Sequence, residues 1–190
     1  MTTVLNLNSI TALNREQFYQ LCLNNPDLNL ERNPQGELII MPPVGAISGN
    51  RESELNGLVW LWNRQTKLGK VFSSSTVFIL PNGGKRSPDV AWIANERWET
   101  LTLEEPEKFA PICPDFVIEL RSRSDSLSQL QSKMQEYLNS GLRLGWLINP
   151  QKKQVEIYRQ NQPLEKVSLP TTLSGEDVLP GFILDLSAIW

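Results

Sequence analysis

The sequence predicts a mixed α/β fold in which a central β-sheet is flanked by helices. Short apolar runs typical of strands outnumber the segments with helical spacing, and residues 116–147 have a strand–helix–strand pattern. The chain has 190 residues, of which 40% are hydrophobic and 21% are charged, and this composition suits a globular protein with a buried core. We therefore expect one domain over residues 1–190.

A helix and a hairpin are expected first. Residues 12–24 carry apolar side chains at helical spacing, and an Asn-Pro pair ends that helix. Two short apolar runs, residues 28–30 and 37–41, flank the turn signal Asn-Pro-Gln-Gly and predict a hairpin. Residues 48–68 have an apolar stripe with the period of an α-helix, which predicts a long amphipathic helix that ends at Gly69.

The rest of the chain supplies most of the strands. Residues 70–80 are rich in β-branched and aromatic residues, and Asn-Gly-Gly then predicts a tight turn before a returning strand at residues 88–93. Residues 115–120 form a compact apolar strand, and residues 126–140 form a helix that Gly141 ends. Further strands are expected at residues 144–148 and 155–158, before an extended tail.

Composition narrows the chemistry. The chain has no histidine, which excludes catalytic triads, general bases and metal clusters that depend on histidine. Its two cysteines, Cys22 and Cys113, form neither a disulfide framework nor a zinc motif. A metal would therefore be a hard ion such as Mg²⁺, Mn²⁺ or Ca²⁺, held by carboxylates.

Charge and hydropathy constrain partners and location. The net charge of −3 argues against a constitutive nucleic-acid binder, although a nuclease with a metal-neutralised acidic site is compatible with it. No apolar run approaches the ~18 residues that a membrane helix needs. The N-terminus lacks the basic and apolar regions of a secretory signal, so we expect a cytoplasmic protein that does not contact membranes.

Two acidic residues lie beside or inside apolar strands, where an unpaired charge is costly. Asp89 follows a proline in Ser-Pro-Asp-Val-Ala-Trp, and Glu119 lies in Asp-Phe-Val-Ile-Glu-Leu-Arg. Strand alternation places Asp115, Val117, Glu119 and Arg121 on one face, and the core residues Phe116, Ile118 and Leu120 on the other. Two carboxylates with a nearby cation are a minimal arrangement for metal-dependent phosphodiester hydrolysis, because the metal activates water and the cation stabilises developing charge.

The strings RSPDVAWI, CPDFVIELRS, KMQEYLNSG and LGWLINP resemble the Uma-two family of restriction-endonuclease-like proteins. The resemblance runs over most of the chain and implies a restriction-endonuclease-like core, which belongs to the PD-(D/E)xK nuclease superfamily. It implies that Asp89 and Glu119 are the two motif acids. The early helix acid of the superfamily would be Glu52 or Glu54, and Glu54 is favoured because it precedes a residue of the apolar stripe.

The basic position departs from the superfamily, because residue 121 is arginine rather than lysine. Arginine stays protonated and cannot act as a base, although it can stabilise negative charge. The resemblance offers Lys133, on the helix at residues 126–140, as a supplement or replacement. We therefore predict Asp89, Glu119, Arg121 and Lys133 as catalytic residues, and we predict metal ligands among Asp89, Glu119, Glu54 and Asp115.

Structural alternatives remain for each of these residues. Asp89 could be a solvated or capping acid, and Glu119 could form a purely structural ion pair with Arg121 or Lys133. Asp115 could simply begin its strand. Lys85 and Arg86, just ahead of Asp89, could contact nucleic-acid phosphates or lie in a solvated turn.

Two functions follow from the sequence. The first is a Mg²⁺- or Mn²⁺-dependent endonuclease acting on DNA, expected as a homodimer by analogy with restriction-like folds that cut duplexes in pairs. The second is a catalytically inactive nuclease-like fold that binds nucleic acid or protein. The acidic balance of the chain and Arg121 favour the second, whereas Asp89 and Glu119 favour the first.

Overall fold

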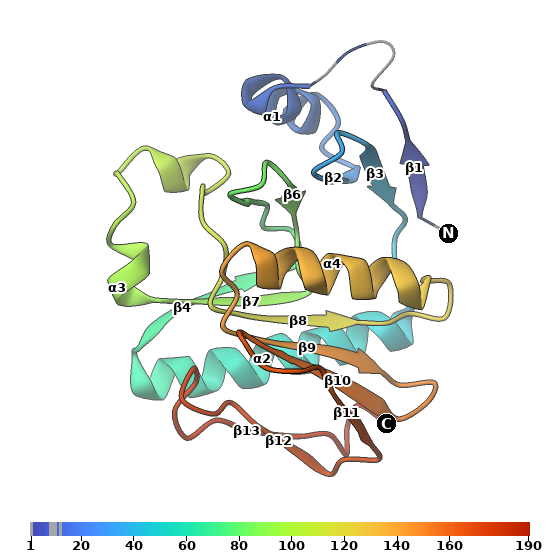
Figure 1. Cartoon of the computed structure of the whole chain (residues 1–190), viewed down its shortest axis with the longest axis vertical. Helices are drawn as coiled ribbons and strands as arrows, with labels where there is room; N and C mark the ends of the chain where they lie inside the picture. Colours follow the sequence, from blue (N-terminus) through green and yellow to red (C-terminus); the bar gives the residue numbers. More distant parts are fainter. Residues whose placement is uncertain (1, 8–10, 12) are drawn as a thin grey trace.

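A computed structural model describes residues 2–7, 11 and 13–190 (Figure 1). Its main element is a six-stranded sheet with the order β11-β10-β9-β8-β7-β4. The strands are β4 (Gly69–Ser73), β7 (Val90–Ala94), β8 (Phe116–Leu120), β9 (Leu144–Asn149), β10 (Gln154–Arg159) and β11 (Glu165–Ser168). Strands β8 and β9 are parallel and the other neighbours are antiparallel, so the sheet is mixed.

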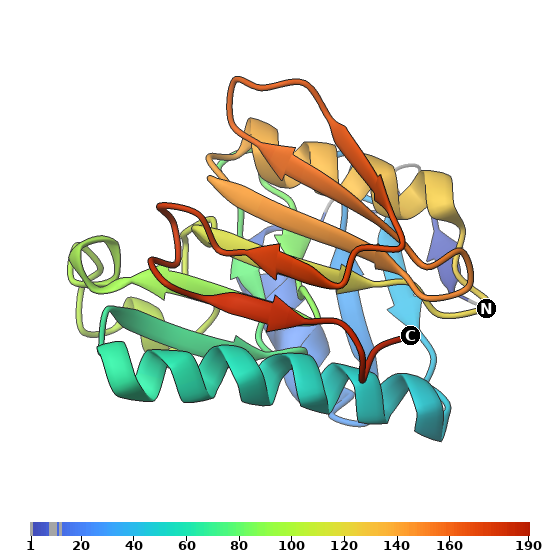
Figure 2. The ribbon, with the colours of Figure 1, turned by 90° about the horizontal axis from the view of Figure 1, so that it is seen from below.

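Helices cover both faces of this sheet, which confirms the predicted fold class. Helix α4 (Leu127–Asn139) connects the parallel strands β8 and β9, and such a connection must cross over one face of the sheet. Helix α2 (Ala46–Thr66) packs on the opposite face, against β4 and β7 (Figures 1 and 2). None of the helices in the described part of the chain has the length and apolar character needed to span a bilayer.

A second, five-stranded sheet has the order β1-β3-β2-β6-β5, and helix α1 (Arg15–Asn24) lies beside it (Figure 1). Its strands are β1 (Thr3–Leu5), β2 (Asn29–Arg32), β3 (Leu38–Met41), β5 (Phe78–Ile79) and β6 (Lys85–Arg86). The predicted hairpin is the β2–β3 pair, and the Asn-Gly-Gly turn joins β5 to β6. The start of the predicted helix, residue 12, lies outside the described residues.

The chain passes between the two sheets at places where the sequence predicts continuous strands. The predicted strand at residues 70–80 divides into β4 and β5, because a turn at residues 74–75 carries the chain from the main sheet to the second. The chain returns after β6 and enters β7 at Val90. The segment between β6 and β7 therefore bridges the two sheets, and it carries Asp89.

Apolar side chains fill both faces of the main sheet. On the α2 face, residues of β7 to β10 pack with the C-terminal hairpin of β12 (Thr172–Ser174) and β13 (Ile183–Asp185), and Trp146 is fully buried there. On the α4 face, Met134 and Tyr137 pack against the sheet. Residues 110–113, which follow α3 (Asn95–Trp98) and the 3₁₀ helix Glu105–Glu107, complete this part of the core. A small third core joins α1 to the second sheet.

Helix α2 ends before the predicted Gly69. Its last residue is Thr66, and Lys67 takes the left-handed conformation with φ of 58°. Gly69 instead begins β4, where an added Cβ would lie 2.2 Å from the carbonyl oxygen of Ile93. The glycine is therefore needed for close approach of two backbones rather than for a helix cap.

The two glycines Gly69 and Gly57 should respond oppositely to alanine. Gly69→Ala is expected to lower the free energy of unfolding by about 1–3 kcal/mol, because the clash is with backbone that cannot rotate away. Gly57→Ala lies inside α2 with open space around the new Cβ, so it should raise stability by up to about 1 kcal/mol. Urea unfolding of both variants checks this, and equal shifts would contradict it.

Candidate active site

The register of the main sheet brings Asp89 and Glu119 together. Strands β7 and β8 are antiparallel, with Val90 opposite Ile118, so one step further along places Asp89 opposite Glu119. Asp89 itself precedes β7, and the two carboxyl groups are close enough for the charge of Glu119 to raise the pKa of Asp89. Asp89 is further fixed by its Oδ2 atom, which accepts a 2.6 Å hydrogen bond from the backbone N–H of Leu120.

The two carboxyl groups resist carrying two negative charges. Burial raises the pKa of Asp89 well above its usual value, and the neighbouring Glu119 raises it further. Burial also raises the pKa of Glu119, and Glu31 adds to that effect, although Lys133 opposes it. The pair is therefore short of positive charge, and a bound cation would favour the doubly ionised form.

Lys133 supplies the one cation in contact with Glu119 among the described residues. It projects from α4, and its Nζ atom lies 2.8 Å from Glu119 Oε1 and 2.8 Å from Glu31 Oε1. It also donates a 3.2 Å hydrogen bond to the carbonyl oxygen of Ser87. Burial alone would lower the pKa of Lys133, but the two carboxylates raise it above its usual value, so this residue remains an ammonium ion. The structure thus brings Lys133 to the predicted site.

Glu31 is a buried member of this cluster that the sequence did not single out. It lies on β2, and the pairing of Arg32 with Lys85 places it opposite Arg86 on β6. Its Oε1 atom accepts a 2.8 Å hydrogen bond from the backbone N–H of Ser87, and its Oε2 atom accepts a 2.9 Å bond from Arg86 Nη1. Burial opposes ionisation, yet Lys133 and Arg86 hold the pKa of Glu31 below its usual value.

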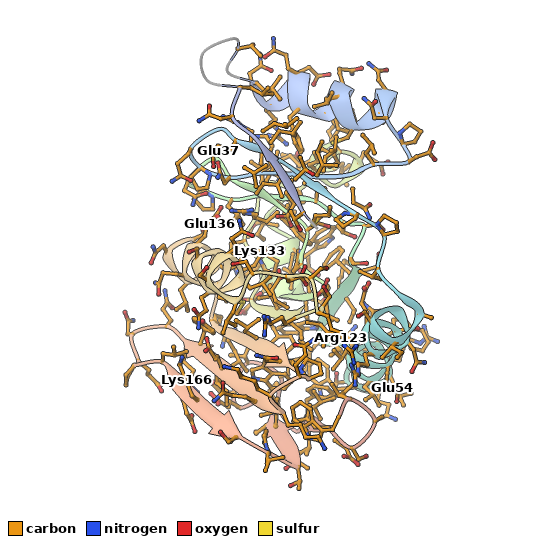
Figure 3. The ribbon with its side chains drawn as sticks, turned by 90° about the vertical axis from the view of Figure 1, so that its right-hand side faces the viewer. Glu37, Glu54, Arg123, Lys133, Glu136 and Lys166 are labelled. Carbon is orange, nitrogen blue, oxygen red and sulfur yellow. The ribbon has the colours of Figure 1, made fainter. Side chains whose placement is uncertain are left out.

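Two side chains of α4 complete the cluster and were also missed. Tyr137 donates a 3.1 Å hydrogen bond to Glu119 Oε1, and burial together with Glu119 raises the pKa of its hydroxyl, which stays protonated. Glu136 accepts a 2.9 Å hydrogen bond from Arg86 Nε. Figure 3 shows Lys133 and Glu136 on the side of α4 that faces the second sheet. Helical spacing predicts that Lys133, Glu136 and Tyr137 share a face, but not that this face is the charged one.

The cluster opens into a cleft of about 2380 Å³ between the two sheets and α2. Asp89, Glu119 and Lys133 line this cleft, and Glu52 reaches it from α2 closely enough to contribute to the raised pKa of Asp89. Glu54, favoured from the sequence, is exposed and does not line the cleft (Figure 3). Two residues turn a helix by about 200°, so only one of these two acids can face the site.

Arg121 does not reach the cleft. Strand β8 ends at Leu120, so the alternation that predicts a shared face for residues 119 and 121 no longer holds. The Arg121 backbone N–H instead donates to the carbonyl oxygen of Ile148 at 2.9 Å, and its Nε donates to that of Asp125 at 3.2 Å. The exposed Arg123, two residues further on, lines the cleft in its place.

Asp115 has a structural role. It lies at the opposite end of β8, about 13 Å along the strand from Glu119. It is fully buried, with Oδ1 2.9 Å from Arg97 Nη1, and its Oδ2 accepts a 2.9 Å hydrogen bond from the backbone N–H of Ala94. The expectation that Asp115 is a metal ligand is therefore not supported.

The two basic residues ahead of Asp89 are buried rather than solvated. Lys85 lies over the Phe18 ring at 5.6 Å from its centroid, and burial lowers its pKa to about 8. Arg86 is paired with Glu31 and Glu136. Neither is free to contact a phosphate as proposed from the sequence. Within the described chain, Arg51 and Arg123 line the cleft without an ion pair and are the better candidates.

The donor atoms suit a hydrated hard cation rather than an enclosed one. In the described part of the chain, no three acidic, histidine or cysteine side chains are arranged to hold a metal. However, hydrogen bonds engage only Oδ2 of Asp89 and Oε1 of Glu119, so that Asp89 Oδ1 and Glu119 Oε2 have no partner among the described residues. Mg²⁺ is commonly held by one or two carboxylates with several waters, and the two free oxygens fit that demand.

Comparison with known proteins places the chain in a family. The sequence profile of Uma2, described as "Putative restriction endonuclease", matches residues 15–187. The chain belongs to the Uma2 family. This assignment confirms the resemblance found in the sequence. A search of curated proteins gave no match.

A solved structure has the same fold as this Uma2 protein. It is titled as a "putative nuclease belonging to DUF820" from Anabaena variabilis. The TM-score is 0.72 at 20% sequence identity, and the match covers 84% of this chain and 88% of the other. The likeness confirms a nuclease-like fold for the present chain.

The raised pKa of Asp89 predicts that this residue destabilises the folded protein at neutral pH. Below about pH 3.8 the residue is protonated in both folded and unfolded chains. As pH rises from there, the unfolded chain ionises first, so native stability falls until the folded pKa is passed. Asp89→Asn should therefore make the metal-free protein more stable at neutral pH. The gain should be about 1.4 kcal/mol for each unit by which the pKa of Asp89 in the folded chain exceeds that in the unfolded chain. In acid, where Asp89 is protonated in both states, the substitution should have no such effect.

Urea unfolding at several pH values measures this effect of Asp89→Asn. Asp115→Asn is the matched control, because it removes the charge that pairs with Arg97 and should destabilise the protein at neutral pH. If Asp89→Asn destabilises the metal-free protein at neutral pH as Asp115→Asn does, the electrostatic account of the site is wrong.

Proposed function

We propose that this Uma2 protein is a divalent-cation-dependent endonuclease that hydrolyses phosphodiester bonds in DNA. The observation that carries the proposal is the meeting of Asp89 and Glu119 across β7 and β8, with the Lys133 ammonium 2.8 Å from Glu119 at the edge of an open cleft. The family description and the nuclease-like fold support the same reaction class.

Each part of the site has a role in this reaction. Asp89 and Glu119 would hold Mg²⁺ or Mn²⁺, which when bound supplies an activated water and neutralises phosphate charge. Lys133 stays protonated, so it acts as a hydrogen-bond donor to a phosphate oxygen as negative charge develops there. It takes the place expected for Arg121, which lies outside the cleft. Arg51 and Arg123 are placed to contact flanking phosphates.

Substrate, assembly and location follow from analogy. DNA follows from the family description as restriction endonucleases. A homodimer would place two sites on the two strands of a duplex, and a cytoplasmic location would give access to DNA. These three points are part of the proposal.

A second candidate function has one observation in its favour. Lys133 is already paired with two carboxylates, and such a network could serve only to join α4 to the two sheets. The chain would then be a nuclease-like module that binds nucleic acid or protein without cutting. The two functions differ in whether divalent ions promote cleavage.

A plasmid-nicking assay tests the proposed function. The parent protein with Mg²⁺ or Mn²⁺ should convert supercoiled plasmid to nicked or linear DNA, and EDTA should stop the reaction. Glu119→Gln and Lys133→Met should each lower the rate by about 10²-fold or more, because one loses a ligand and the other a charge-stabilising donor. A predominance of linear product early in the reaction would support paired sites.

Two controls make the assay specific to the cleft. Arg121→Met should retain most of the activity that Lys133→Met loses. Likewise, Glu54→Gln should retain more activity than Glu52→Gln, because Glu52 lines the cleft and Glu54 does not. Circular dichroism establishes that each variant is folded. A parent protein that binds DNA but never cuts it with either ion would refute the nuclease and favour the binding module.

A further inference from the structure

We propose that Glu31 is a positioning residue that fixes the Lys133 ammonium at the active site. The importance of that ammonium for catalysis rests on the function proposed above. Among the described residues, no hydrogen bond or ion pair joins Glu31 to Asp89 or Glu119, so Glu31 would act through Lys133 and the backbone at Ser87. It is 2% exposed and comes from the second sheet rather than from the main one.

A single oxygen of Glu31 connects the two segments that carry the site. Oε1 lies 2.8 Å from Lys133 Nζ and 2.8 Å from the backbone nitrogen of Ser87. Ser87 begins the bridge that leads through Pro88 to Asp89, and its own carbonyl oxygen accepts a hydrogen bond from Lys133. Glu31 therefore sets the position of α4's lysine relative to the strand that supplies Asp89.

The position of a lysine ammonium depends strongly on its partners, because the side chain is long and flexible. Its flexible stem carries about 2 kcal/mol of rotamer entropy, and one ion pair to Glu119 leaves the ammonium free to rotate. A second carboxylate and the Ser87 carbonyl fix it from another direction. If Glu119 bound a cation, Glu31 and the Ser87 carbonyl would still hold the ammonium beside the cleft.

Glu31 is itself held by Arg86, a buried side chain. Its other oxygen, Oε2, accepts a hydrogen bond from Arg86 Nη1 at 2.9 Å, and Arg86 in turn pairs with Glu136 on α4. Glu136 thus also pairs with Arg86, but in the described structure it forms no ion pair with Lys133. This difference provides a matched control.

The test compares Glu31→Gln with Glu136→Gln. Each removes one buried charge next to Arg86, but only the first removes a partner of Lys133. Glu31→Gln should lower kcat for plasmid nicking by up to about 10²-fold with little change in KM, because a displaced group costs rate rather than binding. Glu136→Gln keeps both carboxylate partners of Lys133, so it should lower kcat much less than Glu31→Gln does.

A second readout does not depend on cleavage. The metal-free, DNA-free proteins are treated with an amine-acylating reagent, and modification of Lys133 is followed by peptide mass spectrometry. Glu31→Gln should speed this modification several-fold over the parent and over Glu136→Gln, since a freed amine is more accessible and more reactive. If Glu31→Gln does not fold, Glu31→Asp keeps the charge but withdraws it by one methylene, and the same acceleration is expected.

The outcomes separate the two proposals. Unchanged Lys133 modification in a folded Glu31 variant, or equal modification in Glu31→Gln and Glu136→Gln, would overturn the positioning role. A loss of kcat that Glu136→Gln reproduces would also overturn it. If the parent protein fails to cut DNA while Lys133 modification still depends on Glu31, the nuclease function fails and the positioning of Lys133 stands.

Discussion

The ion cluster around Lys133 is the interaction on which the rest of the site depends. A lysine that is 8% exposed bridges Glu119 on the main sheet and Glu31 on the second sheet. Removing it would leave Glu119 buried without a cation, which typically costs about 3–5 kcal/mol, and would leave Glu31 with Arg86 as its one cation among the described residues. The same contacts that join the two sheets to α4 therefore also place a positive charge at the edge of the cleft.

Asp89 differs from the buried acids Glu31, Glu119 and Asp115 in having no ion pair with a described residue. Glu31 is paired with Lys133 and Arg86, Glu119 is paired with Lys133, and Asp115 is paired with Arg97. Asp89 has only the backbone N–H of Leu120 as its hydrogen-bond partner among the described residues, and it faces the negative charge of Glu119. Such a group destabilises the fold, and a bound divalent cation would stabilise it. Local instability of this kind is typical of functional sites.

The sequence predicts the parts of the site that local rules govern. Alternation and the apolar character of two strands identify Asp89 and Glu119, and their pairing across β7 and β8 follows from the fold. Lys133 was indicated by the family resemblance, and its helical position agrees with a side chain that points to the sheet. Arg121 was misplaced because no local signal marks the last residue of β8.

Other features needed the tertiary structure. Glu31 lies opposite Arg86 only because β2 pairs with β6, and no spacing in the sequence indicates that pair. Lys85 and Arg86 resemble a solvated turn in the sequence, but the second sheet and α1 bury them. The choice between Glu52 and Glu54 depends on the rotation of α2 against the main sheet, which an apolar stripe defines only to within part of a turn.

A crystal structure of the protein soaked with Mn²⁺, with its anomalous scattering recorded, tests the central claim most directly. We expect one strong anomalous peak within bonding distance of both Asp89 and Glu119, adjacent to Lys133 and absent in crystals of Glu119→Gln. Crystals in which Mn²⁺ binds elsewhere, or leaves these two carboxylates without an ion at millimolar concentration, would contradict the account.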